Sequence, residues 1–140
     1  MTEDFVPYKL AVKLKEKGFK EECLSYYTTE YTLYNNVITL TDDKYLCVSD
    51  IDYEEFLVSH NSIKYTNGNY VDAPTISQVL KWLREEKNIH IEIRLFTCGY
   101  GFDIYKIYPK ERIVWSGTLE YETFEQAAIR GIEYTLYNLI

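Results

Sequence analysis

The sequence has few of the residues and segments that would assign it to a defined functional class. It contains only 2 His and 3 Cys, and their positions show no close metal-ligand spacing. The odd number of cysteines, without a close pair, favours free thiols in a reducing compartment. No hydrophobic run approaches the length of a membrane span, and the first ten residues, MTEDFVPYKL, lack the apolar core of a signal peptide. We therefore expect a cytoplasmic protein.

Positive charge is also scarce. The chain has 15 Lys and Arg against 22 Asp and Glu, a formal net charge of −7. This balance opposes general attraction to nucleic acid or to an anionic membrane. Hydrophobic residues make up 46% of the 140 residues, which predicts a packed core in one domain spanning 1–140.

Tyrosine is abundant, with 15 residues. A tyrosine packs its ring while its hydroxyl stays in contact with water, and aromatic side chains fit the pleated surface of a sheet. We therefore expect strands with a half-exposed, tyrosine-rich face. Because tyrosine is enriched at protein interfaces, part of that face is a candidate binding surface.

The N-terminal part predicts one helix over residues 7–18. Pro7 suits the first helical position, and Gly18 suits the residue that follows the helix. Lysines at positions 9, 13, 17 and 20 form a stripe opposite the apolar face. This Lys9–Lys20 stripe is interpreted as a solvated face, with nucleic-acid binding as the alternative.

Two strands and an irregular segment follow this helix. The strands are predicted at residues 23–29 and 31–40. Residues 41–72 are acidic and irregular, and we expect one or two short strands there, the last ending at Tyr70-Val71.

The C-terminal part has clearer signals. Residues 75–78, TISQ, form a capping box before a helix that Asn88 can end in the left-handed region. Residues 89–95 alternate between apolar and polar side chains, which indicates a strand with one buried face. Two more strands are predicted, in FDIYKIY and IVWSG, with a turn at PKER between them. A second capping box, TFEQ at 123–126, begins a helix that runs close to the C-terminus.

These elements predict an α+β fold in which helices cover an antiparallel sheet. Their order is helix, two strands, the irregular acidic segment, helix, three strands, helix. The stretch TCGYGFD interrupts two alternating segments, so we interpret it as the connection of a hairpin. It lacks the lysine and following helix of a phosphate-binding loop.

No catalytic, cofactor-binding or metal-binding residue is assigned. One enzymatic alternative remains, a dispersed site around Cys98 and His90, although no local signature lowers the pKa of the thiol. A solvated loop explains the carboxylates at 42–55 better than a cation site does.

The element order over residues 75–138 also matches that of a double-stranded RNA-binding domain. That module grips phosphates with lysines at the start of its last helix. Here the corresponding stretch carries Glu120, Glu122 and Glu125, which would repel phosphates. We therefore do not favour a nucleic-acid partner.

Four segments, FVPYKLAVKLKEKGF, CLSYY, APTISQVLKWLREEKNIHIEI and YETFEQAA, resemble a group of small uncharacterised proteins of gut Bacteroides and related bacteria. Members of that group are often encoded in phages or mobile elements. The resemblance leaves residues 41–70 uncovered and implies no activity. We expect a small non-enzymatic accessory protein that binds another protein or itself, with a homodimer as one form. No cofactor and no membrane association are expected.

Overall fold

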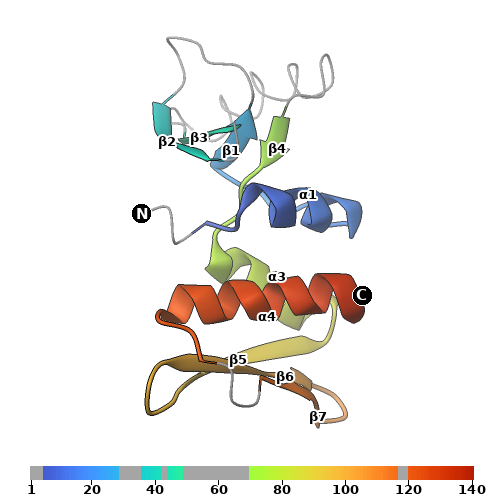
Figure 1. The fold of residues 1–140 in the computed structure, drawn as a ribbon. Helices are drawn as coiled ribbons and strands as arrows, with labels where there is room; N and C mark the ends of the chain where they lie inside the picture. Colours follow the sequence, from blue (N-terminus) through green and yellow to red (C-terminus); the bar gives the residue numbers. More distant parts are fainter. Residues whose placement is uncertain (1–4, 29–35, 42–43, 49–69, 117–119) are drawn as a thin grey trace. The chain divides into compact units, whose positions relative to one another are not determined.

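The computed structural model describes residues 5–28, 36–41, 44–48, 70–116 and 120–140 (Figure 1). Helices and two small antiparallel sheets confirm the predicted α+β class. The strands are divided between two sheets, where the sequence suggested one. Contacts divide the chain into two compact units, Met1–Pro74 and Thr75–Ile140. The interpretation of residues 1–140 as one domain stays a prediction.

In the N-terminal unit, helix α1 spans Tyr8–Glu16 and buries Leu10, Ala11 and Leu14. Pro7 is its N-cap, with φ −61° and an extended ψ, one residue before the position predicted for it. Gly18 follows the helix at φ +93°, as expected of a residue that must adopt the left-handed region.

The sheet of this unit contains β1 (Ser25–Thr28), β2 (Asn36–Thr41), β3 (Lys44–Val48) and β4 (Tyr70–Asp72), in the spatial order β2-β3-β1-β4. All pairs are antiparallel. The strands β3 and β4 agree with the one or two short strands expected within 41–72. Residues 29–35 and 49–69, which include parts of the predicted strands and of the acidic segment, lie outside the described residues.

The tyrosines of the central strand β1 are buried, whereas the sequence suggested tyrosines on a half-exposed face. Tyr26 and Tyr27 are 3% and 2% exposed. The Tyr27 hydroxyl donates to the carbonyl of Val6 at 2.6 Å, and its ring meets Tyr8 of α1 edge to face. Tyr26 lies opposite Cys47 of β3. Both phenols are buried because β1 has a strand on each side and α1 packs nearby.

In the C-terminal unit, α3 spans Ile76–Glu86 and α4 spans Phe124–Asn138. Both predicted capping boxes are confirmed. In each, the threonine side chain accepts from the backbone N–H of the glutamine, and that glutamine side chain accepts from the backbone N–H of the threonine. Asn88 ends the α3 region at φ +59°, also as predicted.

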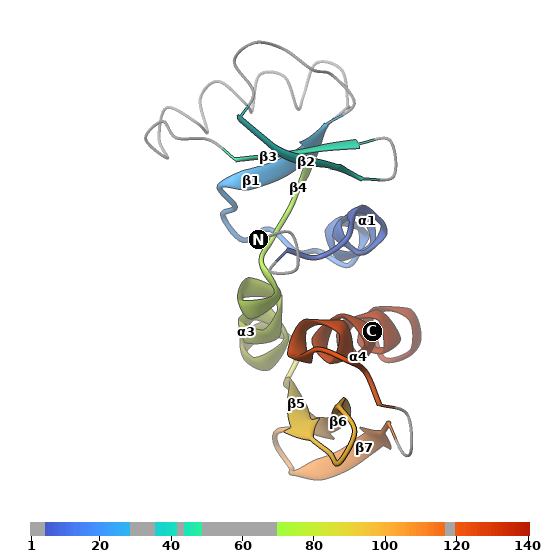
Figure 2. The same cartoon turned by 60° about the vertical axis from the view of Figure 1, so that its left-hand side comes forward.

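The second sheet has the order β5-β6-β7, with β5 at Ile89–Leu95, β6 at Tyr100–Lys106 and β7 at Glu111–Trp115. Within this unit, α3 and α4 lie on one face of the sheet (Figures 1 and 2). The approach of α4 is close at Gly131, where a Cβ atom would lie 2.8 Å from Cγ2 of Ile91. The buried face predicted for β5 is confirmed at Ile89 and Ile91, but Leu95 is 75% exposed.

The stretch TCGYGFD forms the β5–β6 connection and the start of β6, which confirms the predicted hairpin. A Cβ atom on Gly99 would collide with the carbonyl oxygen of Tyr121, whose backbone pairs with Tyr100 in an isolated bridge. A Cβ atom on Gly101 would collide with the Phe96 ring. The glycines therefore serve close packing around the hairpin.

Candidate functional site

The face of the β5-β6-β7 sheet opposite α3 and α4 is the candidate site. Within the C-terminal unit, no described helix lies over this uncovered face (Figure 1). The strand register places Glu92, Asp103 and Trp115 side by side across the three strands. Polar and aromatic side chains of all three strands thus gather on one surface, which follows from the period-two geometry of strands.

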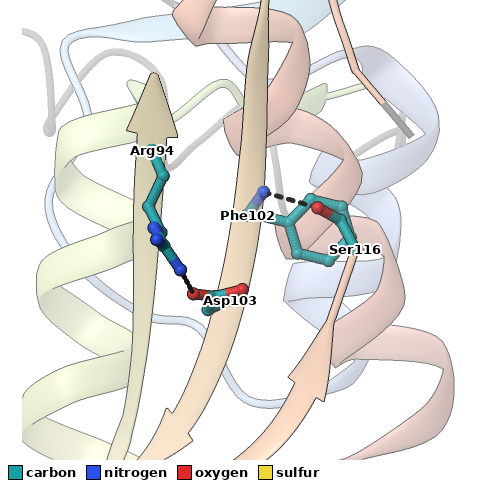
Figure 3. Close-up of polar contacts among 4 residues, drawn as sticks. All are labelled: Arg94, Phe102, Asp103 and Ser116. Atoms are coloured by element: carbon teal, nitrogen blue, oxygen red, sulfur yellow. Dashed lines mark hydrogen bonds and ion pairs between the residues drawn. The ribbon is translucent and has the colours of Figure 1, made fainter. Parts of the chain in front are cut away.

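Asp103 is the most unusual residue of this face. Its side chain is 0% exposed although no helix covers it. Arg94 Nη1 donates to Asp103 Oδ2 at 2.9 Å, and this bond raises the pKa of the Arg94 guanidinium (Figure 3). The second carboxylate oxygen, Oδ1, points away from Arg94 and has no hydrogen-bond partner among the described residues. A buried acceptor without a donor is costly, and such groups are rare in folded proteins.

The backbone around Asp103 is held by the neighbouring strand. The N–H of Phe102 donates to the Ser116 hydroxyl at 3.0 Å (Figure 3). The N–H of Ser116 donates in turn to the Phe102 carbonyl at 2.9 Å. The Phe102 side chain points to the helix side of β6, so Asp103 necessarily points to the uncovered face. The position of the carboxylate is therefore fixed by its strand.

Cationic side chains lie over aromatic rings on the same face and at its edges. The Arg94 guanidinium is 5.4 Å from the Phe96 ring centroid, and that of Arg112 is 5.9 Å from Trp115. Trp115 remains 55% exposed. Such contacts are weak when exposed to water and strengthen when a partner removes the water.

Tyr105 joins this face to a shallow pocket of about 330 Å³, lined by His90, Glu92, Tyr105, Lys106, Ile107 and Lys110. Loss of hydration raises the pKa of the Tyr105 phenol, and the negative charges of Asp103 and Glu92 raise it further. The pocket mixes one carboxylate with two ammonium groups and one imidazole. This composition suits a polar protein surface and does not select a single ligand charge.

The structure does not bring Cys98 and His90 together. Cys98 lies in the turn beyond Leu95, whereas His90 pairs with Tyr105 near the other end of β5. The five residue steps from His90 to Leu95 span about 16 Å of extended strand. Burial raises the pKa of the Cys47 thiol, which opposes nucleophilic reactivity, and Cys23 is also buried.

The described residues include no group of three or more His, Cys, Asp or Glu that could hold a metal ion. The acidic residues of 49–69, and Asp42 and Asp43, lie outside the described residues. No helix among the described residues has the length and apolar character needed to cross a membrane.

In the Lys9–Lys20 stripe, Lys9 and Lys20 are exposed, and Lys13 lies 3.3 Å from Glu16. At the start of α4, Glu122 and Glu125 occupy the region where a double-stranded RNA-binding domain has lysines. The positive charge of the stripe is therefore opposed at Lys13, and the start of α4 carries negative charge.

Sequence reasoning did not identify Asp103 as a site residue. The available signal was the alternation of β5 and β6, which places Arg94 and Asp103 on one face once the hairpin register is known. Comparisons with protein-family models, with curated proteins and with solved structures found no match.

Proposed function

We propose that the chain is a non-enzymatic protein-binding module and that the uncovered face of the β5-β6-β7 sheet is its docking surface for another protein. The observation that carries the proposal is Asp103, whose oxygen Oδ1 is buried on an uncovered face without a donor. Because this carboxylate has no accessible surface, a partner would reach Oδ1 only when the side chains over it move, and a donated hydrogen bond would then remove the cost of the unsatisfied acceptor.

Exposed apolar side chains support the same surface. Among the described residues, four of the nine exposed large hydrophobic side chains belong to β7 or the β6–β7 turn. They are Ile107, Tyr108, Ile113 and Trp115. Clustered exposed apolar residues with a polar rim are typical of interaction surfaces, and Trp, Tyr and Arg are the residues that contribute most to binding energy.

The charges of this face favour a protein over a nucleic acid. Arg94 is paired with Asp103, and Glu92 lies directly beside that carboxylate. These acidic groups would repel a phosphate backbone at the centre of the face, whereas a protein of mixed charge can satisfy both signs. The resemblance to phage- and mobile-element-encoded proteins of gut Bacteroides extends the proposal to a cytoplasmic accessory role in the host bacterium.

The test is quantitative capture of host proteins by the immobilised chain and by two matched variants. Trp115→Ala alters the proposed face, and Tyr137→Ala removes an aromatic side chain of similar exposure, 56% against 55%, from α4. We expect a host protein that the original chain and Tyr137→Ala retain equally, and that Trp115→Ala retains about tenfold less. Circular dichroism establishes that each variant is folded. Equal retention by all three proteins would contradict the proposal.

A further inference from the structure

The outer edge of β5 is unusually regular for a sheet edge. β5 is the first strand in the order β5-β6-β7, and no described strand pairs with its outer side. All seven of its residues pair with β6 without interruption. The opposite edge strand, β7, has a register shift and adjacent charges at Glu111 and Arg112. A bulge protects an edge from pairing, and the β5–β6 pair has none, so β5 is the edge that remains able to add a strand.

Two hydrogen bonds establish which backbone groups of β5 face outward. Phe96 N–H donates to the Gly99 carbonyl at 2.7 Å, and Ile107 N–H donates to the Asn88 carbonyl at 3.0 Å. Hydrogen-bonded pairs alternate with non-bonded pairs along an antiparallel ladder. The even-numbered residues of β5 therefore bond to β6, and the N–H and C=O groups of Ile89, Ile91, Ile93 and Leu95 point to the outer edge.

We propose that β5 pairs in an antiparallel manner with β5 of a second copy of the chain, around a two-fold axis at Ile93. Only residues with outward backbone groups can bond across such an axis, so each odd-numbered residue must lie opposite another odd-numbered residue. An axis at Glu92 would oppose Glu92 to its own copy, and an axis at Arg94 would oppose two arginines. Like charges directly opposite destabilise a strand pair.

The axis at Ile93 gives complementary pairs from Ile91 to Leu95. Glu92 lies opposite Arg94 of the second copy, and the symmetry repeats this pair. Ile91 lies opposite Leu95 of the second copy on the helix side of the sheet, which would cover the 75% exposed Leu95. An axis at Ile91 would instead leave Leu95 without a strand residue opposite it, since β5 begins at Ile89.

Pairing is compatible with the Arg94–Asp103 bond. That bond uses Nη1 of Arg94, and a guanidinium has five N–H donors in all. The product is a closed, two-fold symmetric dimer with a continuous six-stranded sheet, and both copies contribute the same β5 edge to the interface. The uncovered faces of both copies then lie on the same side of that sheet.

This inference goes beyond the proposed docking face, because it assigns a different surface and names its occupant. The two fail separately. Trp115→Ala is expected to leave the dimer intact, and Leu95→Pro is expected to yield a monomer in which Glu92, Asp103 and Trp115 of the uncovered face are unchanged.

The test is molar mass by light scattering after size exclusion, over a range of concentrations. We expect twice the chain mass for the original protein. Glu92→Lys places two like-charged pairs in the interface and should weaken the dimer about tenfold, whereas Glu85→Lys, the same change on exposed α3, should not. Leu95→Pro removes an outward N–H and should give a monomer, while Leu95→Ala keeps that N–H and should retain the dimer.

Arg94 stays unchanged in these tests, because its charge also neutralises the buried carboxylate of Asp103 and its removal should destabilise the fold. A monomeric original chain at every concentration would overturn the inference, and so would a dimer insensitive to Glu92→Lys and Leu95→Pro.

Discussion

Nη1 of Arg94 lies 2.9 Å from Oδ2 of Asp103, and this bond joins a half-exposed guanidinium to a carboxylate with no accessible surface. Asp103 is directly beside Glu92 in the strand register, so Arg94 balances negative charge from both residues. The bond therefore connects the stability of the β5–β6 pair to the charge of the uncovered face.

Removal of the Arg94 charge should destabilise the fold. In Arg94→Met the carboxylate of Asp103 stays buried without a counter-charge, which costs far more than loss of an exposed ion pair. The control is Arg130→Met, whose ion pair with Glu133 is exposed at both ends. We expect a loss of unfolding free energy several times larger for Arg94→Met, as measured by urea denaturation. Equal losses would contradict a structural role for the Arg94–Asp103 pair.

Stability should fall at alkaline pH because of Tyr26. Burial raises the pKa of its phenol above the ordinary value of 10.0, and the neighbouring Cys47 raises it further. Above about pH 10 the unfolded chain can ionise this phenol while the folded chain cannot, so the stabilising contribution present below that pH is lost as pH rises. The loss should reach at most about 1.4 kcal/mol per pH unit from this group.

Urea denaturation from about pH 8 to about pH 11 measures this dependence. Tyr26→Phe should flatten the alkaline decline, although the raised pKa of Cys47 leaves part of it. Tyr108→Phe, at a residue 84% exposed, should leave the decline unchanged. Identical pH profiles for the original chain and Tyr26→Phe would contradict this explanation.

Asn88 links the end of α3 to the β6–β7 turn. Its amide donates to the Tyr108 carbonyl at 2.8 Å, and its side-chain oxygen accepts from the Tyr108 N–H at 3.2 Å. Its φ of +59° suits Asn or Gly but not Ala. Asn88→Ala should therefore cost about 1–2 kcal/mol of unfolding free energy, and Asn88→Gly should cost less. If the Ala variant were at least as stable as the Gly variant, the positive φ at Asn88 would not explain the loss of unfolding free energy.

A side chain at Gly99, in the β5–β6 connection, should destabilise the fold. A Cβ atom there meets the carbonyl oxygen of Tyr121, which accepts from the Tyr100 N–H at 2.8 Å. Gly99→Ala must displace backbone and should cost about 2 kcal/mol or more. Cys98→Ala, at the exposed neighbouring position, should change the unfolding free energy little and provides the control. Equal unfolding temperatures for Gly99→Ala and Cys98→Ala would contradict the close approach of Gly99 to the Tyr121 carbonyl oxygen.

Local signals in the sequence predicted the local structure well. The capping boxes at Thr75 and Thr123 predicted where α3 and α4 begin, because the residues that form a capping box lie within one helical turn. Asn88 and the alternation of residues 89–95 likewise indicated a helix end followed by a strand. Each of these features depends on neighbours close in the chain.

The division into two sheets could not be predicted in this way. β1 pairs with β4, whose residues lie more than forty positions later, and no local pattern identifies that partner. Alternation also wrongly predicted that Leu95 is buried. The pattern indicates which face of the sheet a side chain occupies, but not how far the helices extend along that face. The burial of Asp103 depends on the register of three strands, so the sequence alone did not reveal the candidate site.

The most direct measurement is residue-resolved amide hydrogen exchange along β5, at low and high protein concentration. Amides of His90, Glu92 and Arg94 bond to β6 and should be protected at both concentrations. Amides of Ile91, Ile93 and Leu95 face the outer edge, so we predict that their exchange slows as concentration rises and the second copy pairs with them. Exchange of these three amides at one unchanging fast rate would contradict the claim that this sheet associates through its β5 edge.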